Sequence, residues 1–198
     1  MKNSLLILCL LLTITTQAKT SKLEYLNREG RVTNTIFTSS NKILVKYEGM
    51  SFLMDNDKYY FIRNGKLFNF QKEDRINYPV KKISSSKDCD LYREKSSTKF
   101  LTQLCLKKIE KYNLHESSAK LIHRFFSTFI GVDYLPPEQN IIPVRIESVR
   151  SKDQTLVMSE KLHKYEEVPD NVFEDHLKSQ VKTGKTCNNF RDCYQKSK

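Results

Sequence analysis

From Lys22 to Phe70, polar and apolar positions alternate in short runs, which is the pattern of half-buried β-strands. Turn-forming residues separate the runs at Glu29-Gly30, Glu48-Gly49, Asp55-Asn56-Asp57 and Asn64-Gly65. Short strands joined by short turns predict an antiparallel meander, in which each strand pairs with its neighbour in the sequence.

The Asn64-Gly65 turn sets a register for the two strands that flank it. Both residues tolerate positive φ, as a type I′ hairpin turn requires. The expected cross-strand pairs are Arg63 with Lys66, Ile62 with Leu67, Phe61 with Phe68, Tyr60 with Asn69, and Tyr59 with Phe70. One face then carries Tyr59, Phe61, Phe68 and Phe70, and the other carries Tyr60, Ile62 and Leu67. Both faces are apolar, so both need a cover.

Two later segments space their apolar residues as amphipathic helices do. In "SSTKFLTQLCLKKIEKYN" (96–113), these positions are Leu101, Leu104, Cys105, Ile109 and Tyr112. In "ESSAKLIHRFFSTFIG" (116–131), they are Ala119, Ile122, Phe126 and Phe129. Either helix could cover one face of the sheet.

Strand patterning resumes after the second predicted helix. In "IIPVRIESVR" (141–150), apolar residues alternate with Arg145 and Glu147, and "QTLVMSE" and "KLHKYEEV" are its expected partners. The order of many strands, two helices and more strands predicts an α+β fold. We expect a mostly antiparallel sheet with the two amphipathic helices packed on it.

The chain begins with features of a secretory signal peptide. A positive start at Lys2 precedes an apolar run from Leu5 to Leu12, and Ala18 offers a small residue for cleavage. The run is shorter than the roughly 20 residues that span a bilayer, so we expect no membrane-spanning segment. This predicts a signal peptide over 1–18, a folded domain over 19–176 and a basic tail over 177–198. The protein is expected to be periplasmic or secreted.

Four cysteines remain after such a cleavage: Cys89, Cys105, Cys187 and Cys193. An even number of cysteines in an exported chain indicates two disulfides, which can be paired in three ways. We favour Cys89–Cys105 and Cys187–Cys193, because each pair is close in the sequence. A zinc site is the alternative, but these spacings lack the close C-x2-C arrangement that structural zinc usually uses.

The sequence shows no recognised catalytic or metal-binding motif. The four histidines lie outside patterns such as H-E-x-x-H: His115, His123, His163 and His176. The carboxylate pairs Glu166-Glu167 and Asp55/Asp57 fall at predicted turns, where acids are usually solvated. We therefore predict that the protein is not an enzyme and uses no cofactor or metal.

The chain is basic, with a net charge of +11 at pH 7. Export argues against nucleic acid as its partner. The tail from Lys178 to Lys198 holds six basic residues and one acid, Asp192, so it could contact an anionic envelope surface. Alternatively, its "CNNFRDC" loop merely pins the end of the chain.

The stretch "KYEGMSFLMDNDKYYFIRNGKLFNF" resembles the early meander of periplasmic lipoprotein-carrier (LolA/LolB-like) half-barrels. It is more similar still to uncharacterised exported domains that share this architecture. "TSSNKILVKYEG" is similar to their "I-x-x-N-K-hydrophobic" segment. Pro143-Val144-Arg145-Ile146 and the Val168-Pro169 to Phe173 segment resemble their closing strand and ending. The resemblance covers roughly residues 22 to 176. It implies that the domain over 19–176 is half-barrel-like: a curved, mostly antiparallel sheet, open on one side, with the two amphipathic helices on its concave face. In the carriers this concave cavity receives acyl chains without catalysis.

Two functions follow as expectations. The first is an exported, non-catalytic protein that binds a lipid or other apolar ligand in the half-barrel. The candidate cavity residues are Tyr59, Phe61, Phe68, Phe70, Phe126 and Phe129. The second is a structural or interaction protein of the envelope, with a filled core and a basic tail that makes the useful contact. Disulfides, the basic tail and a Lys-rich surface set the chain apart from the lipoprotein carriers.

Overall fold

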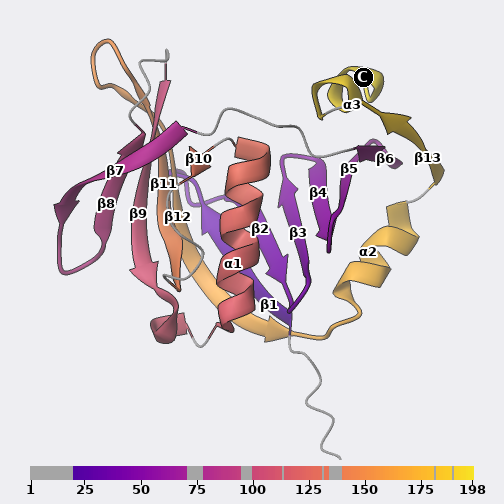
Figure 1. Cartoon of the computed structure of the whole chain (residues 1–198), viewed down its shortest axis with the longest axis horizontal. Helices are drawn as coiled ribbons and strands as arrows, with labels where there is room; N and C mark the ends of the chain where they lie inside the picture. Colours follow the sequence, from indigo (N-terminus) through magenta and orange to yellow (C-terminus); the bar gives the residue numbers. More distant parts are fainter. Residues whose placement is uncertain are drawn as a thin grey trace, which may run out of the picture.

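The strands of the computed structural model form one open, curved sheet (Figure 1). The structure describes residues 20–70, 78–94, 100–112, 114–130, 132–133, 140–180, 182–188 and 190–198. Within these segments the sheet has 13 strands in the order β10-β7-β8-β9-β11-β12-β1-β2-β3-β4-β5-β6-β13. Neighbours pair antiparallel except at the two ends, where β10–β7 and β6–β13 are parallel. The predicted signal peptide, 1–18, lies outside the described residues.

The predicted meander is confirmed. Its strands are β1 (Thr20–Leu26), β2 (Val32–Thr38), β3 (Lys42–Tyr47), β4 (Met50–Asp55), β5 (Lys58–Arg63) and β6 (Lys66–Phe70). All five predicted pairs between β5 and β6 are present, from Arg63–Lys66 to Tyr59–Phe70. Asn64 and Gly65 have φ of 52° and 69°, as the turn chemistry predicts.

The other half of the sheet is made of β10 (Val132–Asp133), β7 (Tyr78–Ser85), β8 (Asp90–Glu94), β9 (Phe100–Lys108), β11 (Ile141–Arg150) and β12 (Leu156–Val168). The two partner strands predicted after β11 are one continuous strand, β12, of 13 residues. Its first part pairs with β11 and its second part pairs with β1. A single strand therefore joins the two halves of the sheet, and a β-bulge opposite Glu24/Tyr25 adds local bend and twist there.

The first predicted helix is wrong: residues 100–108 form β9, followed by a 3-10 turn, η1 (Ile109–Tyr112). Over so short a run, Leu101, Leu104 and Cys105 fit a helix or a strand equally well. Burial on both sides of β9 decides between the two. Leu104 lies in the large hydrophobic core on the concave side of the sheet, the concave core. Gln103, whose side chain points to the opposite side, is also buried.

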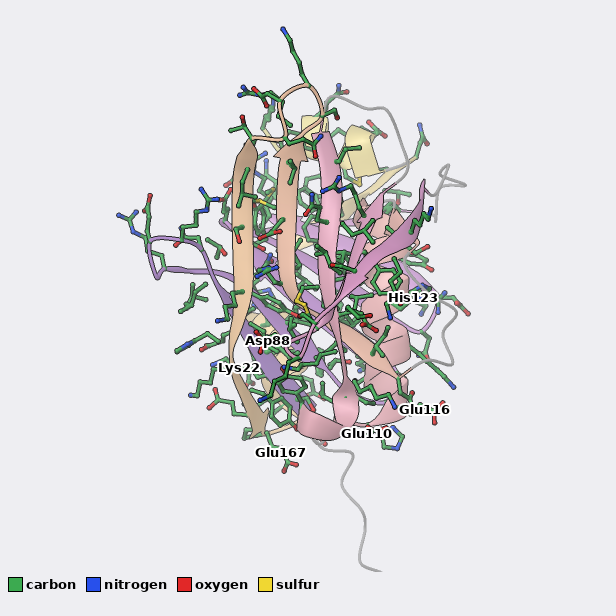
Figure 2. The ribbon with its side chains drawn as sticks, turned by 90° about the vertical axis from the view of Figure 1, so that its left-hand side faces the viewer. Lys22, Asp88, Glu110, Glu116, His123 and Glu167 are labelled. Atoms are coloured by element: carbon green, nitrogen blue, oxygen red, sulfur yellow. A yellow bond between two sulfur atoms is a disulfide. The ribbon has the colours of Figure 1, made fainter. Side chains whose placement is uncertain are left out.

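The second predicted helix is present as α1 (Glu116–Phe125), which continues into a π-helical turn, η2 (Phe126–Ile130). The Nδ1 atom of His115 accepts a hydrogen bond from the backbone N–H of Ser117 and so caps the helix. Figure 2 marks η1 and the start of α1 by Glu110 and Glu116, at the same end of the molecule. The sheet curves around α1 (Figure 1), so of the two predicted helices only this one packs on the concave face.

A second helix, α2 (Val172–Gln180), covers the opposite face of the meander. Its Phe173 is buried in a separate small core with Phe37, Leu44 and Leu53. The apolar residues on both faces of the meander thus have a cover: α1 on the concave side and α2 on the convex side. Burial of a side chain such as Phe173 contributes about 1.5–3 kcal/mol relative to exposure.

The C-terminal segment is part of the sheet. Strand β13 (Lys182–Cys187) pairs with β6, and a short helix, α3 (Phe190–Lys196), folds back on it. The ring of Tyr194 lies 6.4 Å from that of Phe61, and the Arg63 guanidinium lies 4.7 Å from the Tyr194 ring centroid. The basic C-terminal region is therefore anchored to the core.

Both predicted disulfides are confirmed. Cys89–Cys105 ties the start of β8 to β9, with the two Cα atoms 5.5 Å apart. Cys187–Cys193 ties β13 to α3. Both cysteines are buried in the core on the concave side of the sheet. Two disulfides suggest an oxidising, exported environment.

We predict that Tyr194→Ala destabilises the whole domain. The substitution removes the contacts with Phe61 and Arg63, and we expect the free energy of unfolding to fall by about 1–2 kcal/mol, less than for a fully buried aromatic. Urea denaturation measures the change. Gln195→Ala, at the exposed neighbouring position, is the matched control and should change it by less than about 0.5 kcal/mol. An equal, small effect of both substitutions would show that α3 does not support the core.

Candidate ligand cavity

A cavity of about 310 Å³ lies between α1 and the concave face of the sheet. This volume is near the lower end of the roughly 300–1,000 Å³ range of ligand pockets. Its floor comes from strands of both halves of the sheet, with Ile36 on β2, Val45 on β3 and Ile146 on β11. Phe125 and Phe126 form the wall that the helix contributes.

The cavity exists because α1 is short and the sheet is wide. A helix of ten residues is about 15 Å long and cannot cover the concave side of 13 strands. Its aromatic end packs closely on β4, with the rings of Phe125 and Phe52 6.0 Å apart. Phe126 stands edge-on to Phe125 at 5.8 Å. These rings fix the end of the helix on β4, and the cavity lies between this end and strands β2, β3, β11 and β12.

One end of the cavity is polar. Glu160, on β12, is only 2% exposed and accepts a hydrogen bond from the Asn34 side-chain amide at 2.6 Å. Tyr47 also lines this region. Burial raises the pKa of Tyr47, and the negative charges of Glu48 and Glu160 add to the increase. The cavity therefore combines apolar walls with a negatively charged, hydrogen-bonding end.

The structure separates most of the predicted cavity residues from this cavity. Tyr59, Phe61, Phe68 and Phe70 do share one face, as predicted, but they are packed in the core and do not line the cavity. The Phe61 and Phe68 rings lie 6.1 Å apart. Phe126 lines the cavity. The side chain of Phe129 lies outside the described residues.

The sequence reasoning missed most residues that line the cavity, including Ile36, Val45, Ile146, Met158 and Glu160. Alternation along β3 places Val45 on the same face as Ile43, and both are buried in the core under α1. Glu160 gave no such signal, because it stands in a strand rich in charged residues and reads as solvated surface.

A shallower hollow of about 440 Å³ lies on the other face, beside the start of α2. Lys46 and His176 line it, and the Lys46 ammonium lies 5.1 Å from the centroid of the Phe37 ring. The Nε2 atom of His176 lies 3.1 Å from the Ser51 hydroxyl oxygen. Burial, reinforced by the positive charge of Lys46, lowers the pKa of His176 to about 4.

The part of the chain that the structure describes holds neither a metal-binding cluster nor a membrane-spanning helix. There, no three His, Cys, Asp or Glu side chains gather closely enough to hold a metal ion. Likewise, the helices in these ranges are all too short or too polar to cross a bilayer.

Comparison with known proteins adds little. No family model and no curated protein matches the chain. It is similar to the crystal structure of an uncharacterised conserved protein from Thermus thermophilus, with a TM-score of 0.48 and 8% identity over 88% of this chain and 93% of that one. It is also similar to PNGF-II, with a TM-score of 0.41 and 10% identity over 91% of this chain but only 34% of that one. Such distant similarities establish no shared function, and the resemblance to lipoprotein carriers stays a prediction.

The low pKa of His176 predicts a pH-dependent stability. The folded protein keeps His176 neutral down to about pH 4, whereas the unfolded chain binds this proton near pH 6.5. The unfolded state therefore gains protons first, and stability should fall as the pH drops from about 6.5 to about 4. His176→Gln should flatten this part of the profile of unfolding free energy against pH.

The control is His163→Gln, which changes an exposed histidine on β12 and should leave the pH profile as in the unmodified protein. If His176→Gln also leaves the slope unchanged, His176 is protonated equally in both states and its burial has no such effect.

Proposed function

We propose that this protein is an exported, non-catalytic binding protein that holds an apolar ligand in the cavity beneath α1. The observation that carries the proposal is the cavity of about 310 Å³ with walls of Ile36, Val45, Phe52, Phe125 and Phe126. Aliphatic and aromatic walls of this kind release water when an apolar ligand enters, which is the main driving force for such binding. They offer no acid–base chemistry of their own.

The volume constrains the ligand. A cavity near the lower end of the ligand range suits one short alkyl chain or a small ring system. A lipid with several long acyl chains would have to leave most of its apolar surface in water. The proposal is therefore a carrier or sensor of a small apolar molecule, and the two disulfides support its export.

The alternative is an interaction protein that contacts an anionic surface through its basic C-terminal region. We place it second because this region already has a structural role, in which β13 extends the sheet beside β6 and Tyr194 packs on Phe61. A segment fixed in this way presents its charges from a rigid surface and cannot reach out as a free tether.

The proposal predicts that filling the cavity blocks binding. Met158 lines the cavity, whereas its neighbour Val157 on the same strand is 51% exposed and lies outside it. We expect Met158→Trp to raise the Kd of the neutral fluorescent probe phenylnaphthylamine by about tenfold or more, equivalent to about 1.4 kcal/mol. Fluorescence titration measures the Kd.

The matched control is Val157→Trp, which adds the same indole to the solvent side of β12 and should bind the probe as the unmodified protein does. Unfolding curves of both variants check that each is folded. Equal affinities for Met158→Trp and Val157→Trp would place the probe elsewhere, and no binding by the unmodified protein would refute the proposal.

A further inference from the structure

We propose that Glu160, oriented by Asn34, forms a head-group site for a protonated amine at the polar end of the cavity. The ligand would then be a cationic amphiphile: a short apolar body that ends in an ammonium group. This inference rests on the proposed function and names the class of ligand for the same cavity. The site lies between Asn34 on β2 and Glu160 on β12, the two strands that flank β1 in the sheet.

The carboxylate of Glu160 is buried and incompletely satisfied. It is 2% exposed and has one hydrogen bond, from the amide nitrogen of Asn34 at 2.6 Å. A carboxylate can accept about four hydrogen bonds. In the segments that the structure describes, no lysine or arginine forms an ion pair with Glu160. Most of its accepting capacity is therefore available at the edge of the cavity.

A buried charge without a counter-ion is costly, and a cation that enters the cavity would offset that cost. An ammonium group suits this position because it is compact and donates three hydrogen bonds. Asn34 already fills one oxygen of Glu160, so it holds the carboxylate in place for the incoming group.

The other acid that lines the cavity, Glu147, directs its side chain to the opposite face of the sheet, because its neighbour Ile146 is the residue that pairs with Glu160 on the concave face. Its carboxylate lies 3.2 Å from the Arg145 guanidinium, so its charge already has a partner. The local negative charge at the cavity still disfavours a ligand that ends in a carboxylate. A fatty acid would place a second carboxylate beside Glu160, and like charges at short distance repel. Head-group selection should therefore rank amine above alcohol and alcohol above carboxylate.

The overall charge of the protein makes this ranking a sharp test. With a net charge of +11, long-range attraction favours anions over cations. A preference for an amine can then come only from a local group such as Glu160. The alternative role of Glu160 is purely structural, as the partner that fixes Asn34. In that case its substitution would lower stability without changing which head group is preferred.

The experiment compares decylammonium, decanol and decanoate as competitors of phenylnaphthylamine at pH 7, each below its micellar concentration. We expect the unmodified protein to bind decylammonium at least about tenfold more tightly than decanol, and decanoate most weakly. Glu160→Gln should bind decylammonium and decanol with equal affinity. Glu167→Gln is the matched control, because Glu167 is exposed near the end of the same strand, β12 (Figure 2).

The outcomes separate the two proposals. If decanol displaces the probe but the unmodified protein shows no preference for the amine, the head-group site is refuted and the apolar cavity stands. The same holds if folded Glu160→Gln keeps the preference. If none of the three competitors displaces the probe, the proposed function itself fails. The ranking by the unmodified protein needs no variant, so it decides the question even if Glu160→Gln does not fold.

Discussion

The aromatic contact between α1 and the meander is the interaction on which the concave side of the sheet depends. Phe125 packs against Phe52 on β4 and against Phe126, so the end of the helix is fixed over one half of the sheet. Arg124 strengthens the attachment: its guanidinium donates to the Tyr59 hydroxyl at 2.7 Å and pairs with Asp57 at the β4–β5 turn. The cavity lies beside this contact, between the end of the helix and strands β2, β3, β11 and β12.

The remaining apolar surface of the meander is closed by elements from the end of the chain. Helix α2 brings Phe173 to the convex face, and β13 with α3 brings Tyr194 to Phe61. The disulfide Cys187–Cys193 holds this last unit together within the core. The apolar residues on both faces of β5 and β6 are thus explained by packing, and the cavity lies beside them.

Local turn chemistry made the meander predictable. Asn64-Gly65 alone defined five cross-strand pairs, and the proximity of cysteines in the sequence indicated both disulfides. The same reasoning failed at β9, where a short apolar run fits two periods and the choice depends on burial from both sides. Pattern alone does not reveal that β9 is a central strand.

The cavity could not be predicted for a different reason. Its walls unite Ile36 with Ile146 and Phe125, which are far apart in the chain. The pairing of β12 with both β1 and β11 brings them together, and no local signal encodes that pairing. Glu160 has charged neighbours in the sequence, and only the fold turns it inward.

The central claim is that the concave side of this sheet receives an apolar ligand beneath α1. Methyl-resolved NMR during titration with phenylnaphthylamine tests it most directly, because the two faces of the meander carry distinct methyl groups. The claim predicts shifts for Ile36, Val45 and Ile146, which line the cavity, and none for Leu44 and Leu53, which pack under α2. Shifts confined to Leu44 and Leu53, or no shifts at saturating probe, would contradict it.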